Sequence, residues 1–264
     1  MFFKDIKEYV KKLKESFKER IKALPQRPKL VIFQVGDVEA SNRYVRNKVK
    51  DCEEVGIEVE VRKFPETITQ PQFTFKIARA TSENDVDGIM VQLPLPQHLE
   101  GHYKKAIPNF MDVDGFNAGS LFEPATPKGI MDYLKYCGFE FCGKDVVIIG
   151  RSEIVGKPLA RMMTDADATV TLCHSKSKLG PHLENADLIV SAVGKEKFLD
   201  CGRLVVPVVD VGINFDKDGK MCGDCYNAQG KDVTPVPGGV GLLTRCALLD
   251  NVIRAKEIEC GRIG

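Results

Sequence analysis

Three side chains that can take part in chemistry are spaced at helical intervals in the stretch SNRYVRNKVKDCEEVGIEV. They are the hydroxyl of Ser41, the phenol of Tyr44 and the amine of Lys48, at positions i, i+3 and i+7. Residues at this spacing share one face of an α-helix. A lysine on such a face can transfer protons when burial or a neighbouring cation lowers its pKa. From these residues alone, the simpler interpretation of Tyr44 and Lys48 is an exposed pair on a helix.

A glutamine and two aspartates follow a later apolar run. Gln92 stands in VDGIMVQLPLP, where a buried strand gives way to prolines. Open α/β sheets bind ligands at the carboxyl ends of their strands, so an amide fixed at this place is a candidate ligand contact. Asp112 and Asp114 lie further along the chain, in the loop MDVDGF between the two halves. The alternative for Gln92 is a solvated loop amide.

A glycine turn joins a predicted strand to a predicted helix in IIGRSEIVGKP. Gly150 ends the strand, Ser152 stands where a dinucleotide fingerprint has its second glycine, and a helix opens near Gly156. In such turns the backbone approaches a phosphate, and the helix N-terminus supplies N–H donors and a positive dipole end. The pattern favours a dinucleotide site, with a plain strand–helix turn as the alternative.

The end of the next predicted strand bears on which dinucleotide is bound. NAD-binding folds place an acidic residue there, which holds the ribose hydroxyls. VTLCHSKSK offers His174, Ser175 and Lys176 instead, and Arg151 lies in the glycine turn. Cations and a hydroxyl suit a 2′-phosphate, so these residues favour NADP. An ordinary surface histidine is an equal alternative for His174.

The elements around these residues alternate between strand and helix in two similar halves. Strands are expected at PKLVIFQVG, IEVEVRKFP and VDGIMVQLPLP, and then at DVVIIG, ATVTLCHS, DLIVSAVG and LVVPVVDVGI. Between the halves, Thr126 can cap a helix that has Pro127 in its first turn and ends at Gly138. A final helix is expected near Ala247 to Ile258. We therefore predict an α/β fold with an N-terminal substrate domain, a Rossmann-like parallel-sheet NADP domain and a cleft between them.

Composition and charge exclude several classes of protein. The 264 residues are 43% hydrophobic and 28% charged, with a net charge of +1, so a general electrostatic attraction to nucleic acid is weak. The lysine-rich start KDIKEYVKKLKESFKERIK carries an apolar stripe and is interpreted as a surface helix packed on a core. No apolar run reaches the roughly 18 residues of a membrane span, and no signal-peptide pattern is present. We expect a cytoplasmic protein without a membrane or nucleic-acid partner.

Nine cysteines are scattered along the chain, and an odd number without a secretion signal indicates reduced thiols. Cys222 and Cys225 form a single CxxC motif. Because no second pair follows at zinc-finger spacing, a chance pair is favoured over a redox or metal role, and no metal is expected.

Seven motifs in order along the chain resemble those of one known family. They are SNRYVRNK, VQLPLP, DVDGF, TPKG, GRSEIVGKP, ATVTLCHS and TPVPGGVG. Together they are similar to the bifunctional methylenetetrahydrofolate dehydrogenase/cyclohydrolases, over roughly residues 29 to 250. The resemblance implies NADP-dependent oxidation of 5,10-methylenetetrahydrofolate, then hydrolysis of the 5,10-methenyl product to 10-formyltetrahydrofolate. It also implies a homodimer through the nucleotide domain, a folate domain at residues 1–119 with 245–264, and an NADP domain at 120–244.

The resemblance further assigns roles to individual residues. Lys48 matches the catalytic lysine, Tyr44 matches the tyrosine whose ring stacks on folate, and Gln92 and Asp114 match the partners of the lysine. The implied substrate contacts are Ser41, Tyr44, Val91, Leu93, Asp114, Pro237, Gly238 and Gly239. The implied cofactor contacts are Gly150, Arg151, Ser152, Ser175 and Ile213.

The two reactions make different demands on these residues. Hydride transfer from the methylene carbon to nicotinamide depends chiefly on orientation. Hydrolysis of the methenyl group needs proton transfer, for which Lys48 serves either as a base or as an electrostatic anchor. The carboxylate of Asp114 is expected to accept N–H donors of the pterin ring. The glycines of PVPGGVG are expected to let the backbone approach the substrate.

Two other functions stay open at this point. The loop of residues 115–125 is shorter than is usual in the family, and Ala125 stands where cysteine is common. One alternative is therefore a dehydrogenase with reduced cyclohydrolase activity. A nonenzymatic folate- or nucleotide-binding regulator is the other. The joint presence of Lys48, Gln92 and Asp114 argues against the regulator.

Overall fold

The computed structural model describes residues 2–262, which divide into two compact units. The first unit holds residues 12–125 together with the chain from Ala247 onward, and the second holds residues 126–246 together with the chain up to Lys11. These boundaries differ by a few residues from the expected ones. The residues up to Lys11 also group with the second unit rather than with the first.

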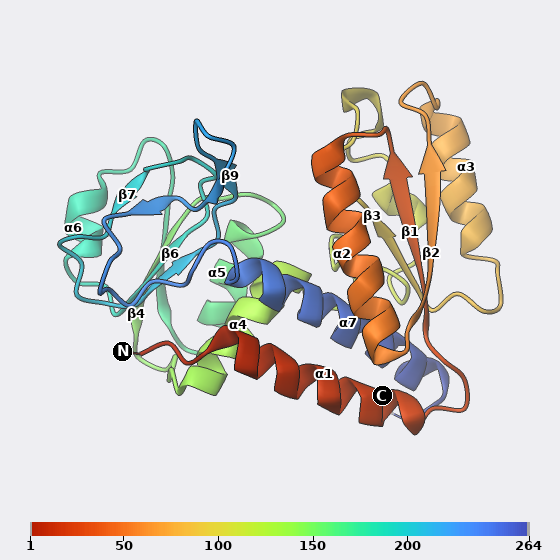
Figure 1. Ribbon diagram of the computed structural model, residues 1–264, viewed down its shortest axis with the longest axis horizontal. Helices are drawn as coiled ribbons and strands as arrows, with labels where there is room; N and C mark the ends of the chain where they lie inside the picture. Colours follow the sequence, from red (N-terminus) through yellow and green to blue (C-terminus); the bar gives the residue numbers. More distant parts are fainter. Residues whose placement is uncertain (1, 263–264) are drawn as a thin grey trace. The chain divides into compact units, whose positions relative to one another are not determined.

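The first unit is built on a three-stranded parallel sheet with strand order β2-β1-β3. Its elements are β1 (Lys29–Val35), α2 (Glu39–Val55), β2 (Glu58–Phe64), α3 (Gln70–Ala80) and β3 (Gly88–Val91), followed by the short 3-10 turns η1 (Gln97–Leu99) and η2 (Lys104–Ala106). Helices α2 and α3 lie on opposite faces of the sheet (Figure 1). A parallel strand covered on both faces is apolar along most of its length, which explains the uninterrupted run LVIF.

Side-chain alternation along β3 decides which residues meet α2. Ile89 and Val91 point into the core formed with Phe73 and Ile77 of α3. Because successive side chains on a strand point to opposite faces, Met90 points to the α2 side, and Gln92 continues that alternation just beyond the strand. The face of α2 that carries Lys48 therefore lies over the carboxyl end of β3.

Local signals set the ends of the helices in this unit. Gly56 ends α2 with φ +98°, and its N–H donates to the carbonyls of Cys52 and Glu53, as a left-handed cap requires. The backbone N–H of Thr69 donates to the side chain of Gln72, one half of a capping box at the start of α3. Both signals are local in sequence, and they place α2 and α3 correctly.

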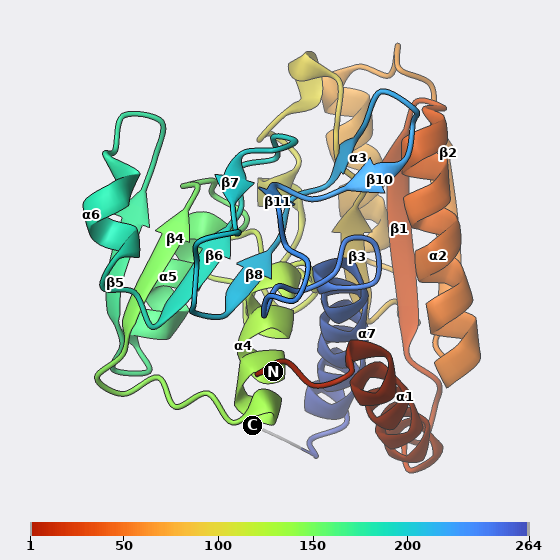
Figure 2. The same ribbon diagram turned by 60° about the vertical axis from the view of Figure 1, so that its left-hand side comes forward.

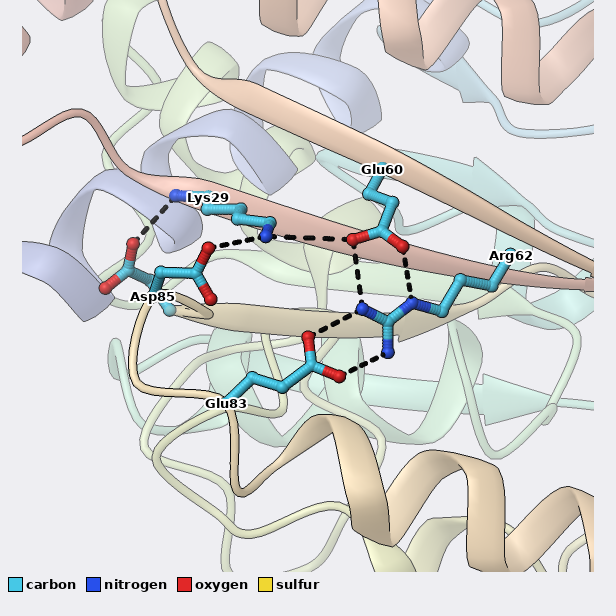
Figure 3. A network of polar contacts seen from close by, with 6 residues as sticks. Lys29, Glu60, Arg62, Glu83 and Asp85 are labelled. Atoms are coloured by element: carbon cyan, nitrogen blue, oxygen red, sulfur yellow. Dashed lines mark hydrogen bonds and ion pairs between the residues drawn. The ribbon is translucent and has the colours of Figure 1, made fainter.

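A network of ion pairs joins the two long strands to the loop before β3 (Figure 3). Arg62 on β2 pairs with Glu60 at 2.7 Å and with Glu83 at 2.6 Å, and Lys29 on β1 pairs with Asp85 at 2.7 Å. These pairs are partly exposed, so each is worth about 0–1 kcal/mol. They brace the sheet and do not belong to the groups expected to do chemistry.

The second unit is built on a four-stranded parallel sheet with strand order β5-β4-β6-β8 (Figure 2). Its principal elements are α4 (Ala125–Cys137), β4 (Asp145–Ile149), α5 (Gly156–Thr164), β5 (Thr169–Cys173), α6 (Leu179–Leu183), β6 (Leu188–Ser191) and β8 (Val208–Asp210). Two short ladders accompany them, β7 (Leu199–Asp200) with β11 (Cys225–Tyr226), and β9 (Asn214–Phe215) with β10 (Met221–Cys222). The predicted α/β class with parallel sheets is confirmed.

Three details of the second half differ from the sequence expectation. Helix α4 begins at Ala125, so Thr126 is not its N-cap; the Thr126 hydroxyl instead shares a hydrogen bond of 3.0 Å with the hydroxyl of Thr244. The run LVVPVVDVGI forms a strand only at Val208–Asp210, because Pro207 has no N–H for a ladder. Helix α6 and the four short strands were not predicted.

The first and last helices each contain a point at which the chain passes from one unit to the other. Helix α1 (Ile6–Lys22) buries its predicted apolar stripe. Helix α7 (Val240–Glu259) begins earlier than the expected Ala247, and its second half packs on the N-terminal part of the chain as predicted. There Asn251 donates to two backbone carbonyls, and Lys256 pairs with Asp87 at 3.2 Å.

Candidate active site and dinucleotide site

The amine of Lys48 is held at the carboxyl end of β3. Its Nζ lies 3.1 Å from Gln92 Oε1 and 3.6 Å from Met90 Sδ. The other end of the same amide, Gln92 Nε2, donates to the carbonyl of Leu93 at 2.6 Å. Because both ends of the amide are engaged, the Gln92 oxygen faces the lysine. The sequence expectation of a fixed amide is thus met, and the solvated-loop alternative is excluded.

Asp114 is the carboxylate of this site, and its side chain is buried. Burial raises the pKa of Asp114 to about 6, the charge of Lys48 lowers it, and the charge of Asp112 raises it. A carboxyl group with this pKa exchanges its proton near neutrality. The first unit therefore places Lys48 against Gln92 and within electrostatic reach of Asp114.

The loop that carries Asp114 is held by hydrogen bonds from within the first unit. Asp112 Oδ2 accepts from the backbone N–H of Asn117 at 2.7 Å. Asn251 of α7 donates to the carbonyl of Val113 at 2.9 Å and to that of Glu123 at 3.0 Å. These bonds span up to 138 residues of sequence, so no local pattern could have predicted them.

Tyr103 is a neighbour of the carboxylates that the sequence did not reveal. Burial raises the pKa of the Tyr103 hydroxyl, and the charges of Asp114 and Asp112 raise it further. Tyr103 is far from Lys48 in the sequence, so no local pattern indicated that it lies near these carboxylates.

Ser41 lies on α2 two turns before Lys48, and Tyr44 lies one turn before it. Ser41 is buried, and the hydroxyl of Tyr44 is buried without a hydrogen-bond partner among residues 2–262. Burial also raises the pKa of that phenol. A buried polar atom without a partner is costly, so it marks a place where a bound molecule can supply one. Val91 and Leu93 flank Gln92, the first buried and the second half-buried.

In the second unit, the turn from β4 to α5 depends on two glycines. Gly150 has φ +118°, and a Cβ there would overlap the carbonyl of Ala192. A Cβ on Gly156 would overlap the carbonyl of Gly150. Ser152 Oγ accepts from the N–H groups of Val155 and Gly156, at 3.2 and 3.4 Å, at the start of α5. Close packing of strand, turn and helix thus requires the glycines of the fingerprint.

The donors expected for a dinucleotide are exposed at neighbouring strand ends. Arg151 and Ser152 follow β4, and Ser175 follows β5, its paired neighbour. His174 Nδ1 accepts from the backbone N–H of Lys176 at 3.2 Å, so this histidine shapes the turn after β5. Ile213 is 46% exposed in the segment after β8. An exposed guanidinium with hydroxyls on adjacent strand ends fits a ligand that carries phosphates.

Pro237, Gly238 and Gly239 lie in the loop before α7, within the second unit. Gly238 has φ +98°, and a Cβ on Gly239 would overlap the carbonyl of Pro235. Both positions therefore need glycine for the loop itself. Their contact with a substrate held near Lys48 stays a prediction.

Other candidate features are structural in the part of the chain described. All nine cysteines are free thiols, so Cys222 and Cys225 of the CxxC motif do not form a disulfide. No group of three or more His, Cys, Asp or Glu side chains within residues 2–262 is placed to hold a metal ion. Over the same residues, no helix has the length and apolar character needed to cross a membrane.

Comparison with known proteins agrees with both halves of this geometry. The family model "Tetrahydrofolate dehydrogenase/cyclohydrolase, catalytic domain" matches residues 5–114, and the model "Tetrahydrofolate dehydrogenase/cyclohydrolase, NAD(P)-binding domain" matches residues 124–260. The chain belongs to the tetrahydrofolate dehydrogenase/cyclohydrolase family.

Individual relatives match over nearly the whole length. The bifunctional protein FolD of Dechloromonas aromatica is 43% identical, over 97% of this chain and 98% of that protein. The crystal structure of the bifunctional enzyme FolD from Campylobacter jejuni is 39% identical with a TM-score of 0.92, over 97% of this chain and 98% of that one. A Trypanosoma brucei member of the family, solved with NADP and an inhibitor, is 28% identical with a TM-score of 0.91, over 98% of both chains.

This tetrahydrofolate dehydrogenase/cyclohydrolase is therefore a bifunctional enzyme of folate one-carbon metabolism, with an NAD(P)-binding domain. The family, the enzyme class and the two reactions that the sequence motifs indicated are confirmed. The nonenzymatic regulator is set aside.

Proposed function

We propose that Lys48, Gln92 and Asp114 form the centre that hydrolyses the methenyl group. The observation that carries this proposal is the amine of Lys48, 3.1 Å from the fixed amide oxygen of Gln92 and close enough to Asp114 to affect its pKa. Water that adds to the methenyl carbon must lose a proton as the ring opens to the formyl product. Lys48 holds or accepts that proton, and Gln92 fixes the position of the amine.

The folate is held by the residues around this centre. Asp114 in its ionised form accepts N–H donors of the pterin ring, and the ring of Tyr44 stacks on the folate. The orphaned Tyr44 hydroxyl supports the contact, since a ligand there would supply its missing partner. The remaining substrate contacts are assigned to Ser41, Val91, Leu93, Pro237, Gly238 and Gly239.

The second unit is assigned to NADP rather than to NAD. When bound, the dinucleotide accepts the hydride that leaves the methylene carbon. The turn of Gly150 and Ser152 holds the pyrophosphate of the dinucleotide at the start of α5. Ile213, in the segment after β8, contacts the dinucleotide. Arg151 and Ser175 hold the 2′-phosphate. Support comes from the residues after β5, which are basic and polar rather than acidic, and from the NADP bound to the Trypanosoma brucei relative.

Absorbance at the wavelength of methenyltetrahydrofolate tests the two activities on the purified protein. With methylenetetrahydrofolate and NADP, formation of the methenyl compound reports the dehydrogenase. With methenyltetrahydrofolate alone, its decay above the uncatalysed rate reports the cyclohydrolase. Rapid formation combined with uncatalysed decay would favour the alternative of a dehydrogenase with reduced cyclohydrolase activity.

The assembly and location follow from the family resemblance. A homodimer through the nucleotide-binding domain and a cytoplasmic location belong to this proposal, with tetrahydrofolate derivatives as the substrates.

A further inference from the structure

One buried carboxylate in the second unit, that of Asp224, is the meeting point of two loops. Its side chain is 0% exposed. Its Oδ2 accepts from Ser191 Oγ at 3.0 Å and from the backbone N–H groups of Val193 and Gly194 at 2.8 and 3.2 Å, and its Oδ1 accepts from the N–H of Lys195 at 2.8 Å and from Asn214 Nδ2 at 3.1 Å. Five donors on one carboxylate leave it little freedom to move.

The two loops held in this way follow neighbouring strands of the parallel sheet. Residues 193–195 follow β6 after one intervening residue, and Asn214 begins β9 at the end of the loop after β8. Strand β8 pairs with β6. Both loops therefore leave the carboxyl edge of the sheet, the edge at which dinucleotides bind.

A second aspartate fixes Asp224 itself. Asp210 at the end of β8 accepts from the backbone N–H groups of Gly212, Asp224 and Cys225, at 2.9 to 3.0 Å. A Cβ on Gly212 would overlap the Asp224 carboxylate, and a Cβ on Gly223 would overlap that of Asp210. The Asp224 carboxylate thus fills the space that a side chain at position 212 would need, and the Asp210 carboxylate fills the space at position 223. This close packing fixes the positions of both carboxylates.

All five donors to Asp224 are uncharged, although its carboxylate is fully buried. Burying a carboxylate is costly, and neutral donors offset this less well than a cation does. The two loops it joins carry exposed apolar side chains, Val193 at 38% and Ile213 at 46%. These two side chains are therefore accessible to a ligand at the carboxyl edge of the sheet.

Strand order indicates which part of a dinucleotide these loops meet. The proposed 2′-phosphate residue Ser175 follows β5, and the glycine turn for the pyrophosphate follows β4. Strands β6 and β8 lie on the other side of β4 from β5, so they fall under the nicotinamide end.

We propose that Asp224 is a positioning residue for hydride transfer, which holds residues 193–195 and the segment of Ile213 so that Val193 and Ile213 form an apolar surface for the nicotinamide ring. The inference rests on the proposed dinucleotide site of the second unit. Asp224 does not touch the reacting atoms and acts through the loops it holds.

Asp224→Asn tests this role, because the amide keeps the size of the side chain and loses acceptor capacity toward the loop amides. Hydrogen bonds to a charged group are worth about 1.5–3 kcal/mol, which corresponds to about 10- to 100-fold. We expect the KM for the dinucleotide to rise by at least about tenfold on that scale. Cyclohydrolase activity, measured on methenyltetrahydrofolate without dinucleotide, should stay unchanged, because the five donors to Asp224 all lie in the second unit and Lys48, Gln92 and Asp114 lie in the first.

Asp218→Asn is the matched control, since Asp218 is an exposed aspartate in the β9–β10 hairpin that precedes Asp224. It should leave both activities unchanged. If Asp224→Asn leaves the dinucleotide KM unchanged, or lowers both activities and the unfolding temperature together, the positioning role is wrong. If the wild-type protein itself fails to bind dinucleotide, the proposed function fails instead.

Asn214→Ala keeps the test decisive if Asp224→Asn does not fold, because it removes only one of the five bonds. Its dinucleotide KM should rise with cyclohydrolase activity retained, and a deuterium isotope effect on hydride transfer should increase as orientation is lost. An unchanged KM and isotope effect in this variant would overturn the proposal.

Discussion

At the scale of single residues, the proposed chemistry rests on the amine of Lys48 and the carboxyl group of Asp114. Lys48 is the sharper case, since its partner Gln92 is fixed by a second hydrogen bond to Leu93. Lys48→Met keeps the apolar stem and removes the nitrogen. Cyclohydrolase activity should fall by at least about 10²-fold, the lower range for general acid–base help, and should fall more than dehydrogenase activity does. Both reactions are measured separately, with thermal unfolding as the control for folding.

Near-normal cyclohydrolase activity in a folded Lys48→Met protein would make Lys48 an ordinary cation of the helix face. Equal losses in both reactions would instead assign it to substrate binding common to both.

Asp114 gives a prediction for pH dependence. Its pKa in the folded chain, about 6, lies above the ordinary value of 3.8, so the fold favours the protonated carboxyl. This contribution to stability is complete below about pH 4 and is lost as the pH rises through about 6. Relative to Asp114→Asn, the wild-type free energy of unfolding should fall by about 3 kcal/mol from about pH 4 to about pH 7. Denaturant unfolding at a series of pH values measures this.

The same titration should appear in substrate binding. Only ionised Asp114 can accept two N–H donors, so the wild-type KM for folate should rise as the pH falls below about 6, an effect absent from Asp114→Asn. Parallel pH profiles for the two proteins would contradict the role of Asp114.

At the scale of elements, helix α7 holds the loop that presents Asp114. Asn251→Leu preserves the volume approximately but leaves the carbonyls of Val113 and Glu123 without their donor. Leaving buried groups unsatisfied costs about 1–3 kcal/mol each, so the loss of both bonds should lower the free energy of unfolding by about 2–6 kcal/mol. The KM for folate should rise while the KM for dinucleotide stays unchanged. Chemical denaturation and steady-state kinetics measure the two effects, and an unaltered folate KM would show that α7 does not support the site.

At the scale of the whole molecule, the proposed preference for NADP rests on side chains that follow two different strands. Arg151→Ala removes a charge-assisted contact to the 2′-phosphate, which is worth about 10- to 100-fold in affinity. The KM for NADP should rise by that factor while the KM for NAD barely changes. Equal catalytic efficiency of the wild-type protein with NADP and NAD would contradict the assignment, whatever the variant does.

The assembly is a second prediction at this scale. We expect the purified protein to have twice the mass of the 29.3 kDa chain in light scattering after gel filtration. A single-chain mass across the concentrations used for kinetics would exclude the homodimer.

Patterns that are local in sequence determined much of this protein. Apolar runs of strand length, the glycine after α2 and the spacing of Ser41, Tyr44 and Lys48 each act over a few residues, so their structural result can be read directly. The turn at Gly150 belongs to the same class, because strand, glycine and helix follow one another along the chain. Seven such patterns in order were enough to indicate the family.

Tertiary structure alone decided the contacts between distant segments. The approach of Lys48 to Gln92 spans 44 residues, and the two bonds from Asn251 span 138 and 128. The pKa of Asp114 follows from burial, which depends on what packs over the loop rather than on its neighbours in sequence. The role of Asp224 was hidden for the same reason, since its donors come from segments up to 33 residues away. Sequence sets the direction in which a side chain points, and the packing of remote elements decides what it meets.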